Sequence, residues 1–172
     1  AARAALVIYD ESARMSRMLF GLLDLARFDA GQTGVGRAPF DLAALLAGLV
    51  QKFSPAARQA QVDLKMELAP PPGAANSAAE RAVMMVGDPD RLGQAFANLL
   101  DNALKYTPAG GQVRIWLQPG DGGVDVRVLD DGPGIPPAEL ERIFERFYQT
   151  DKSRRSGRHG AGLGLAIARE IV

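Results

Sequence analysis

The sequence predicts an α+β fold, a two-layer α/β sandwich with helices on one face of a mixed, mostly antiparallel sheet, preceded by a long helix. About five strand patterns and three or four helical patterns follow one another between residues 35 and 172. A separate seven-residue apolar repeat runs through residues 1–30. With 172 residues, 47% of them hydrophobic, the chain is long enough for one sizeable core and an appendage.

Charge and composition argue against several classes of protein. Twenty acidic and twenty basic residues cancel, so neither a nucleic acid nor an anionic membrane is expected as the principal partner. The absence of cysteine excludes disulfides and thiolate metal sites, which agrees with a reducing compartment. The chain shows no signal peptide and no apolar run near the ~20 residues that a membrane span requires. Because it starts at Ala and stops within a helical pattern, we expect a piece of a longer protein.

Residues 1–31 predict a helix that packs in a bundle. The apolar seam consists of Ile8, Met15, Met18, Leu22 and Leu25. Glu11 occupies a seam position, so the repeat is imperfect and favours a bundle over a simple two-stranded coil. Glycines at 31, 34 and 36 then separate this helix from a globular domain over residues 35–172.

From residue 35 the pattern alternates between strand and helix. A short extended piece ends at Phe40, and Asp41 is a predicted N-cap for an amphipathic helix that follows it. Strict alternation from Val62 to Leu68 predicts a half-buried strand. Residues 69–80 are rich in Pro, Ala and small polar residues and predict an exposed connection, and residues 82–86 predict a second short strand.

The stretch 88–108 predicts the central amphipathic helix. Asp88 can cap its first amides, Pro89 suits the first helical position, and Pro108 marks its end. The face predicted to enter the core consists of Leu92, Ala95, Phe96, Leu99, Leu100 and Ala103.

A polar strip follows the flank of this helix. Asn98, Asn102 and Tyr106 recur every four residues, and Lys105 lies three beyond Asn102. Such a strip is either a solvated face or a surface that meets a ligand. Carboxamide oxygens can bind a hard cation, and an ammonium group suits phosphate.

Two further strands, 112–117 and 124–129, predict a hairpin connected by residues 119–123. The second strand runs into Asp130-Asp131-Gly132-Pro133-Gly134. Glycines two apart allow a flat ligand to approach the backbone, and a neighbouring carboxylate can accept a hydrogen bond from an exocyclic amine. Taken alone, this stretch would indicate only a tight turn.

A second glycine-rich stretch, Gly160-Ala161-Gly162-Leu163-Gly164, is predicted to open the last helix. The free amides and positive dipole end of that helix form an anion site. The stretch has neither the Lys-Ser/Thr ending of a P-loop nor the position of a dinucleotide fingerprint, so alone it is weak evidence.

Four motifs nevertheless occur in a specific order. They are Asn-x-x-x-Asn-Ala-x-Lys-Tyr at 98–106, Asp-x-Gly-x-Gly at 130–134, Ile-Phe-Glu-Arg-Phe-Tyr at 143–148 and Gly-x-Gly-x-Gly at 160–164. In this order they are similar to the N, G1, F and G2 boxes of sensor histidine kinases of two-component systems. The chain resembles the ATP-binding catalytic domain of these kinases, which belong to the GHKL (Bergerat-type) superfamily shared with type II topoisomerases, MutL and a heat-shock chaperone.

The resemblance extends over nearly the whole chain. Residues 1–31 resemble the second helix of the family's dimerisation and histidine phosphotransfer domain, and residues 35–172 resemble its catalytic domain without the last strands. The helix that carries the phosphoacceptor histidine would precede residue 1, so no catalytic residue is assigned in this chain. The single histidine, His159, is expected to be an exposed loop residue.

The resemblance implies ATP and Mg²⁺ as cofactors. Asp130 would accept from the adenine amine, and Tyr106 would lie against the base or sugar. Asn102, aided by Asn98, would hold Mg²⁺, and Lys105 would contact a phosphate. The other implied ATP-binding positions are Gly132, Gly134, Ile135, Arg146, Gly160, Gly162, Leu163 and Gly164.

The same resemblance implies an ATP lid over residues 149–159. Its cations, which would neutralise triphosphate charge or be merely solvated, are Lys152, Arg154, Arg155 and Arg158. Phe144 and Phe147 are expected to be core and lid-anchoring residues. Ala161 and Gln149 replace the hydroxyl and the arginine often found at their positions, which weakens the phosphate assignments there.

The implied activity is transfer of the γ-phosphoryl group of ATP to a histidine and then to an aspartate of a response regulator receiver domain. The implied setting is a homodimer, joined through the N-terminal helical segment, in the cytoplasmic part of an inner-membrane sensor. The alternatives are an ATP-driven clamp or chaperone-like ATPase and a nucleotide-binding module without turnover. Asn98 stands where the clamp proteins have a glutamate base, and an amide cannot accept that proton.

Overall fold

The computed structural model of the chain describes residues 36–69, 82–120, 122–149 and 161–172, and eight helical positions between Ser12 and Ala26. The chain divides into two compact units. Val35–Gly134 forms one, which we call the sandwich unit. Ala1–Gly34 together with Ile135–Val172 forms the other, which we call the helical unit.

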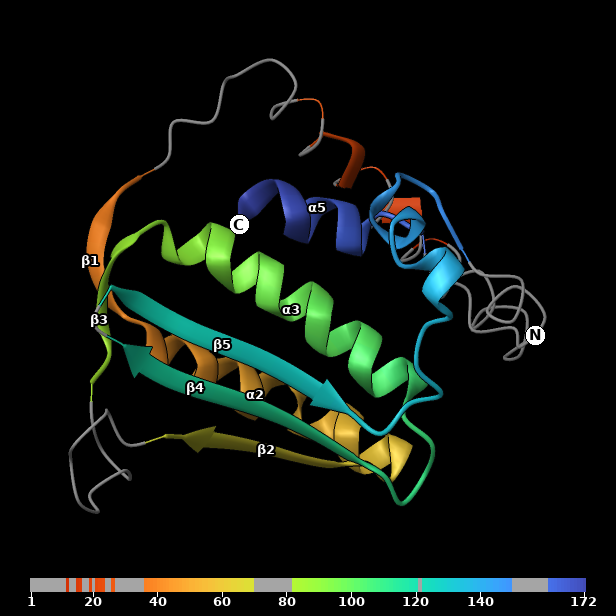
Figure 1. The fold of residues 1–172 in the computed structure, drawn as a ribbon, viewed down its shortest axis with the longest axis horizontal. Coiled ribbons are helices and arrows are strands. Elements are labelled where there is room, and N and C mark those ends of the chain that lie inside the picture. Colours follow the sequence, from red (N-terminus) through yellow and green to blue (C-terminus); the bar gives the residue numbers. More distant parts are fainter. Residues whose placement is uncertain are drawn as a thin grey trace. The chain divides into compact units, whose positions relative to one another are not determined.

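The sandwich unit contains two sheets (Figure 1). The smaller sheet pairs β1 (Ala38–Asp41) with β3 (Met84–Gly87) in antiparallel orientation. In the larger sheet β4 (Gln112–Gly120) lies between β2 (Asp63–Leu68), to which it is parallel, and β5 (Gly123–Asp130), to which it is antiparallel. The predicted α+β class and the mixed, mostly antiparallel pairing are confirmed. The strands form two sheets, however, where the sequence predicted one.

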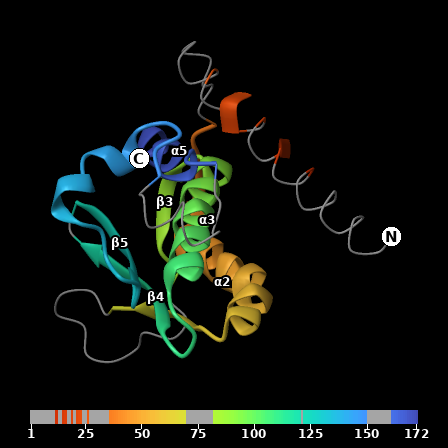
Figure 2. The ribbon, with the colours of Figure 1, turned by 90° about the vertical axis from the view of Figure 1, so that its right-hand side faces the viewer.

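Two helices cover one face of the larger sheet, as Figures 1 and 2 show from two directions. The helix α2 (Leu42–Ala60) packs beside β2, and α3 (Pro89–Tyr106) packs beside β5 and against α2. This is the predicted two-layer arrangement.

Both predicted helix caps are present. Asp41 Oδ1 accepts from the N–H of Ala43 at 3.0 Å and from the N–H of Val83 at 2.9 Å, so it also ties α2 to the chain before β3. Asp88 Oδ1 accepts from the N–H groups of Asp90 and Arg91 at 3.1 and 3.0 Å. A carboxylate at the N-cap satisfies amides that have no partner within the helix.

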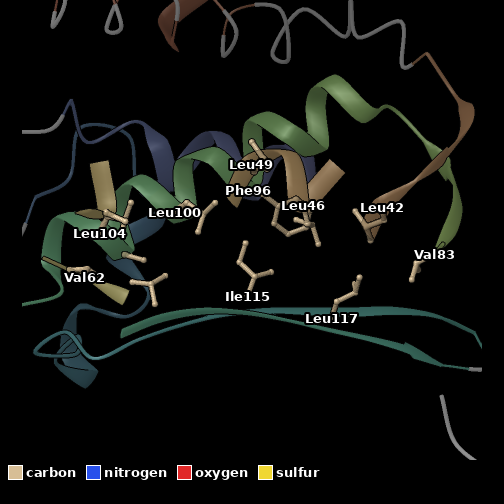
Figure 3. Packing of buried hydrophobic residues seen from close by; sticks show 13 residues of the cluster. Leu42, Leu46, Leu49, Val62, Val83, Phe96, Leu100, Leu104, Ile115 and Leu117 are labelled. Carbon is tan, nitrogen blue, oxygen red and sulfur yellow. The ribbon is translucent and has the colours of Figure 1, made fainter. Parts of the chain in front are cut away.

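The core of the sandwich unit lies between the helices and the larger sheet (Figure 3). Its largest fully buried side chains are Leu46, Leu100, Val113, Ile115 and Leu117. Of the predicted core face of α3, Ala95, Phe96, Leu100 and Ala103 are buried, and Leu92 and Leu99 pack against the core. Leu104, which that face did not include, is buried as well.

The β4–β5 hairpin is longer than predicted. Pro119 pairs with Val124 and Gly120 with Gly123, so residues expected in the connection lie within the strands. Proline is tolerated there because β4 has a single partner beyond Leu117, where its pairing with β2 ends.

The helical unit contains the turns η1 (Pro137–Glu139) and η2 (Arg142–Phe144) and the helix α5 (Gly164–Ile171). The helical positions described near the N-terminus meet α5 at Gly21, which is buried. A Cβ at Gly21 would lie 3.1 Å from Leu163 Cδ1 and 3.4 Å from Ile167 Cδ1. The close approach of the two segments therefore depends on the missing side chain.

The predicted N-terminal seam is only partly described. Met15 and Leu22 are exposed, by 60% and 42%, and so are Leu19 and Leu23 outside the seam. Ile8, Met18 and Leu25 lie outside the described residues. Within the described part of the chain, no helix is both long enough and apolar enough to cross a membrane.

Candidate functional site

The polar strip predicted on the central helix is a feature of α3. Asn98, Asn102, Lys105 and Tyr106 occupy its last turns and are all half-buried. The side-chain nitrogen of Asn98, Nδ2, is buried and has no hydrogen-bond partner among the described residues. Lys105 Nζ lies 5.1 Å from the centre of the Tyr106 ring. The strip thus presents amide, ammonium and phenol groups, one of which has an unmet hydrogen-bonding capacity.

A turn with a fixed carboxylate follows β5. Asp130 is the last residue of that strand and is exposed, and its Oδ1 accepts from the N–H of Gly132 at 2.8 Å. A Cβ at Gly132 would collide with Asp130 Oδ1 and would lie 3.5 Å from the carbonyl oxygen of Tyr106. Glycine at 132 therefore allows the carboxylate to approach the backbone beside the last residue of α3. The second oxygen, Asp130 Oδ2, takes no part in this bond.

The neighbouring carboxylate has a different partner. Asp131 Oδ2 accepts from the N–H of Gln112 at 3.0 Å, and the Asp131 N–H donates to the Gln112 carbonyl at 3.2 Å. Asp131 thereby fastens the turn to the start of β4. The two adjacent aspartates therefore have different hydrogen-bond partners. Gly134, with a φ of +67°, ends the turn.

The helical unit holds the second glycine-rich stretch. Gly162 and Leu163 precede α5, and Gly164 is its first residue. Leu163 is 2% exposed, and its carbonyl accepts from the N–H of Ile167 at 2.9 Å. Among the described residues, no side chain caps the first amides of α5. The anion site that the sequence predicts at these amides stays a prediction.

Of the other predicted positions, the structure describes some and not others. Ile135, 44% exposed, and Arg146, also exposed, belong to the helical unit. Gly160 lies outside the described residues, as do the predicted lid cations and His159.

Two aromatic rings of this segment, those of Phe144 and Tyr148, each lie close to an arginine. The Arg142 guanidinium lies 4.4 Å from the centre of the Tyr148 ring, and that of Arg169 lies 5.5 Å from the centre of the Phe144 ring. Phe144 and Phe147 are 37% and 54% exposed, so the prediction that they are core residues is wrong. The described core of the helical unit is built instead on Leu163 and Ile167.

A backbone contact that the sequence did not predict joins the two ends of residues 147–162. Phe147 has a φ of +63°, and its N–H donates to the carbonyl of Gly162 at 2.8 Å. Gly162 has a φ of +70°, and a Cβ there would lie 2.7 Å from Phe147 C. No sequence pattern marks a phenylalanine for a left-handed backbone, which non-glycine residues adopt uncommonly.

Comparison with known protein families shows to which family the chain belongs. Residues 87–172, half of the 172-residue chain, match the family described as histidine kinase-, DNA gyrase B- and HSP90-like ATPase. The chain belongs to this ATPase family. The match begins at the end of β3 and includes α3, the Asp130 turn and the glycine-rich start of α5.

Similar proteins within the ATPase family include sensors and histidine kinases. The chain is 38% identical over 163 residues to the probable sensor protein PcoS of Escherichia coli. The aligned region covers 95% of this chain and 32% of PcoS. It matches ShkA, solved as a full-length complex with AMPPNP, with a TM-score of 0.77 and 31% identity, over 98% of this chain and 33% of ShkA. It matches the catalytic domain of the histidine kinase ThkA with a TM-score of 0.64 and 27% identity, over 79% of each chain. The chain is therefore a sensor histidine kinase ATP-binding domain, and it spans about a third of the length of PcoS and of ShkA.

Proposed function

We propose that this domain presents Mg-ATP for transfer of the γ-phosphoryl group to a histidine of the full protein. The observation that carries the proposal is the Asp130 turn, in which one carboxylate oxygen is fixed by Gly132 at 2.8 Å beside the end of α3. The other oxygen can then accept from the exocyclic amine of adenine in a defined direction. A flat base can approach this turn because glycines at 132 and 134 carry no side chains, and Tyr106 supplies an apolar contact.

The polar strip of α3 offers oxygen ligands that would suit a Mg²⁺ ion bound together with ATP. Mg²⁺ takes hard oxygen ligands and usually keeps several waters, so one or two protein oxygens and the phosphates suffice. In this proposal Asn102 supplies a carboxamide oxygen. Asn98, whose buried Nδ2 has no partner among the described residues, is proposed to aid Asn102 in holding the ion, and Lys105 would contact a phosphate.

In the helical unit, the start of α5 is proposed to bind phosphate oxygens. The groups involved are the amides at Gly162, Leu163 and Gly164, and Gly160 and Arg146 are assigned to the same task. A phosphoryl transition state is loose and highly charged, so catalysis rests mainly on positioning and charge stabilisation. Bound Mg²⁺ would add to that stabilisation.

The wider setting is proposed by analogy. ThkA, whose catalytic domain this chain resembles, has been solved in complex with the response regulator TrrA. We assign a receiver domain of that kind as the phosphoryl acceptor after histidine. Residues 1–31 are proposed to belong to the dimerisation domain and 35–172 to the catalytic domain of a homodimeric sensor, on the cytoplasmic side of an inner membrane. The exposed Met15, Leu19 and Leu22 agree with a helix that has a further partner.

A full-length protein incubated with γ-labelled ATP tests the kinase function. We expect the dimer to label itself through an acid-labile, alkali-stable bond, the behaviour of phosphohistidine. Steady release of phosphate without any protein label would favour the clamp-type ATPase instead. That alternative lacks support at Asn98, because an amide cannot take a proton from the attacking water.

Metal dependence tests the role of Asn102. We expect Asn102→Ala to lose most of the gain in ATP affinity that Mg²⁺ produces, roughly tenfold, while metal-free binding changes little. Calorimetric titration of ATP with Mg²⁺ and with EDTA measures both. The exposed neighbour provides the control, since Asp101→Ala is expected to keep the full Mg²⁺ effect. An Asn102→Ala protein with the Mg²⁺ dependence of the parent would show that this amide is not a ligand.

A further inference from the structure

The ladder between β4 and β5 ends at Asp131 with a side chain in the place of a main-chain group. Val113 pairs with Asp130, so Gln112 and Asp131 form the next pair. The Asp131 N–H donates to the Gln112 carbonyl at 3.2 Å, as in a regular antiparallel pair. The Gln112 N–H, however, donates at 3.0 Å to Asp131 Oδ2, where a regular pair would use the main-chain carbonyl. A carboxylate thus completes the last pair of the sheet, and the main chain turns away from it.

The start of β4 at Gln112 is itself held by two other elements of the sandwich unit. The N–H of Asp63, the first residue of β2, donates to the Gly111 carbonyl at 2.9 Å. The Gly110 N–H donates at 2.8 Å to the carbonyl of Gln61, the C-cap of α2. A side chain that is bonded to Gln112 is therefore bonded to a point that β2 and α2 already fix.

The same point lies beside the end of α3, which Figure 1 shows next to the end of β5. A Cβ at Gly111 would lie 2.7 Å from Thr107 Cγ2 and 3.4 Å from Asp131 Cβ. Thr107, the C-cap of α3, is 4% exposed, and its hydroxyl donates to the Ala103 carbonyl at 2.7 Å. Glycine at 111 therefore allows the Asp131 side chain and the buried C-cap of α3 to approach the same backbone.

Asp131 is also the middle residue of the turn that fixes Asp130. Asp130 Oδ1 accepts from the Gly132 N–H at 2.8 Å, so the ring that this bond closes runs through the backbone of Asp131. Two hydrogen bonds to Gln112, one from the Asp131 N–H and one to its carboxylate, restrict rotation of that backbone. The direction in which Asp130 Oδ2 points therefore depends on the bond that the Asp131 side chain makes.

We propose that Asp131 is a positioning residue for base selectivity: by taking the place of a main-chain carbonyl in the last pair of the sheet, it holds the Asp130 carboxylate in the direction that accepts from an exocyclic amine. The inference rests on the proposed function, in which Asp130 meets adenine. A purine with a carbonyl in place of that amine presents an acceptor to an acceptor. A carboxylate that is fixed in direction rejects such a base more strongly than one that rotates.

Titration of the full-length protein with ATP and with ITP, both with Mg²⁺, tests this proposal. ITP carries the same triphosphate and has a carbonyl where ATP has the exocyclic amine. We expect Asp131→Ala to bind ATP roughly five- to tenfold more weakly and ITP about as tightly as the parent, so the preference for ATP falls by the same factor. Asp131→Asn keeps an oxygen that accepts from the Gln112 N–H, so this variant is expected to retain the preference.

A second variant keeps the test decisive if Asp131→Ala does not fold. Asp131→Glu retains the charge but carries the carboxylate one methylene further from the backbone, so it is expected to lose the preference as well. Asp41→Ala controls for stability alone, because it removes a carboxylate that accepts from two N–H groups at the start of α2. This helix has 19 residues, so about 28 Å separate that cap from Gln61. Asp41→Ala is expected to unfold at a lower temperature and to keep the preference of the parent for ATP.

Three results would overturn the proposal. Equal losses of ATP and ITP affinity in a folded Asp131→Ala protein would give Asp131 a structural role only. An unchanged preference for ATP in that variant would give it no role in selectivity, and an equal loss of preference in Asp131→Asn would trace the effect to the charge. A parent protein that binds ATP and ITP equally would instead refute the adenine assignment of Asp130, and with it the proposed function on which the inference rests.

Discussion

An Asp130→Asn variant is expected to bind ATP roughly 10- to 100-fold more weakly than the parent, because a hydrogen bond to a charged acceptor contributes about 1.5–3 kcal/mol. The asparagine oxygen can still accept from the Gly132 N–H, so the turn after β5 should survive. The amide NH₂ would then replace Asp130 Oδ2 and would face the adenine amine, donor against donor. Calorimetric titration with ATP measures the loss.

The adjacent aspartate is the matched control for that experiment. Asp131 Oδ2 accepts from the Gln112 N–H at the start of β4, a role that an asparagine oxygen can also fill. Asp131→Asn should therefore retain ATP affinity. Equal affinity in the parent and a folded Asp130→Asn protein would remove Asp130 from the adenine site.

A Leu100→Ala variant should lose about 2–5 kcal/mol of unfolding free energy, because truncation of a fully buried leucine removes apolar burial and leaves a cavity. Leu100 is 0% exposed and lies on α3 between the two layers of the sandwich unit (Figure 3). Urea unfolding followed by circular dichroism measures the change. Because α3 also carries the polar strip, ATP affinity should fall together with stability.

Leu129→Ala provides the same chemical change at a surface position. Leu129 lies on β5 and is 46% exposed. Its truncation should therefore change the unfolding free energy by no more than about 0.5 kcal/mol. Similar losses for the two variants would contradict the placement of the core between the helices and the larger sheet.

Local chemistry made much of the fold predictable. Asp41 and Asp88 each precede an apolar helical repeat, and both prove to be caps because a carboxylate next to free amides needs no distant partner. The amide strip was predictable for the same reason, since residues four apart on a helix share a face wherever the helix lies. Asp130 was placed at a strand end by the hydrophobic alternation before it.

Features that depend on distant pairing were not predictable. The division into two sheets arises because β1 pairs with β3, although α2 and β2 lie between them in the sequence. No local pattern encodes this pairing. Pro119 lies in a strand because the pairing of β2 with β4 ends at Leu117, so no partner on that side needs a proline N–H. The length of β2 decides this, and residues around Pro119 do not reveal it. The different roles of Asp130 and Asp131 depend on which of them reaches Gln112. The hydrogen bond from Phe147 to Gly162 joins residues fifteen apart in sequence.

The bare backbone of Gly21 against Leu163 and Ile167 makes the contact with α5 sensitive to angle. A helix advances about 100° per residue, so a turn of the N-terminal helix by one position would bring the side chain of Leu22 to the place where even a Cβ would lie 3.1 Å from Leu163. A leucine would fit in that space only if the side chains of Leu163 and Ile167, or α5 itself, shifted. A rotation of these helical positions would therefore require a rearrangement at the start of α5.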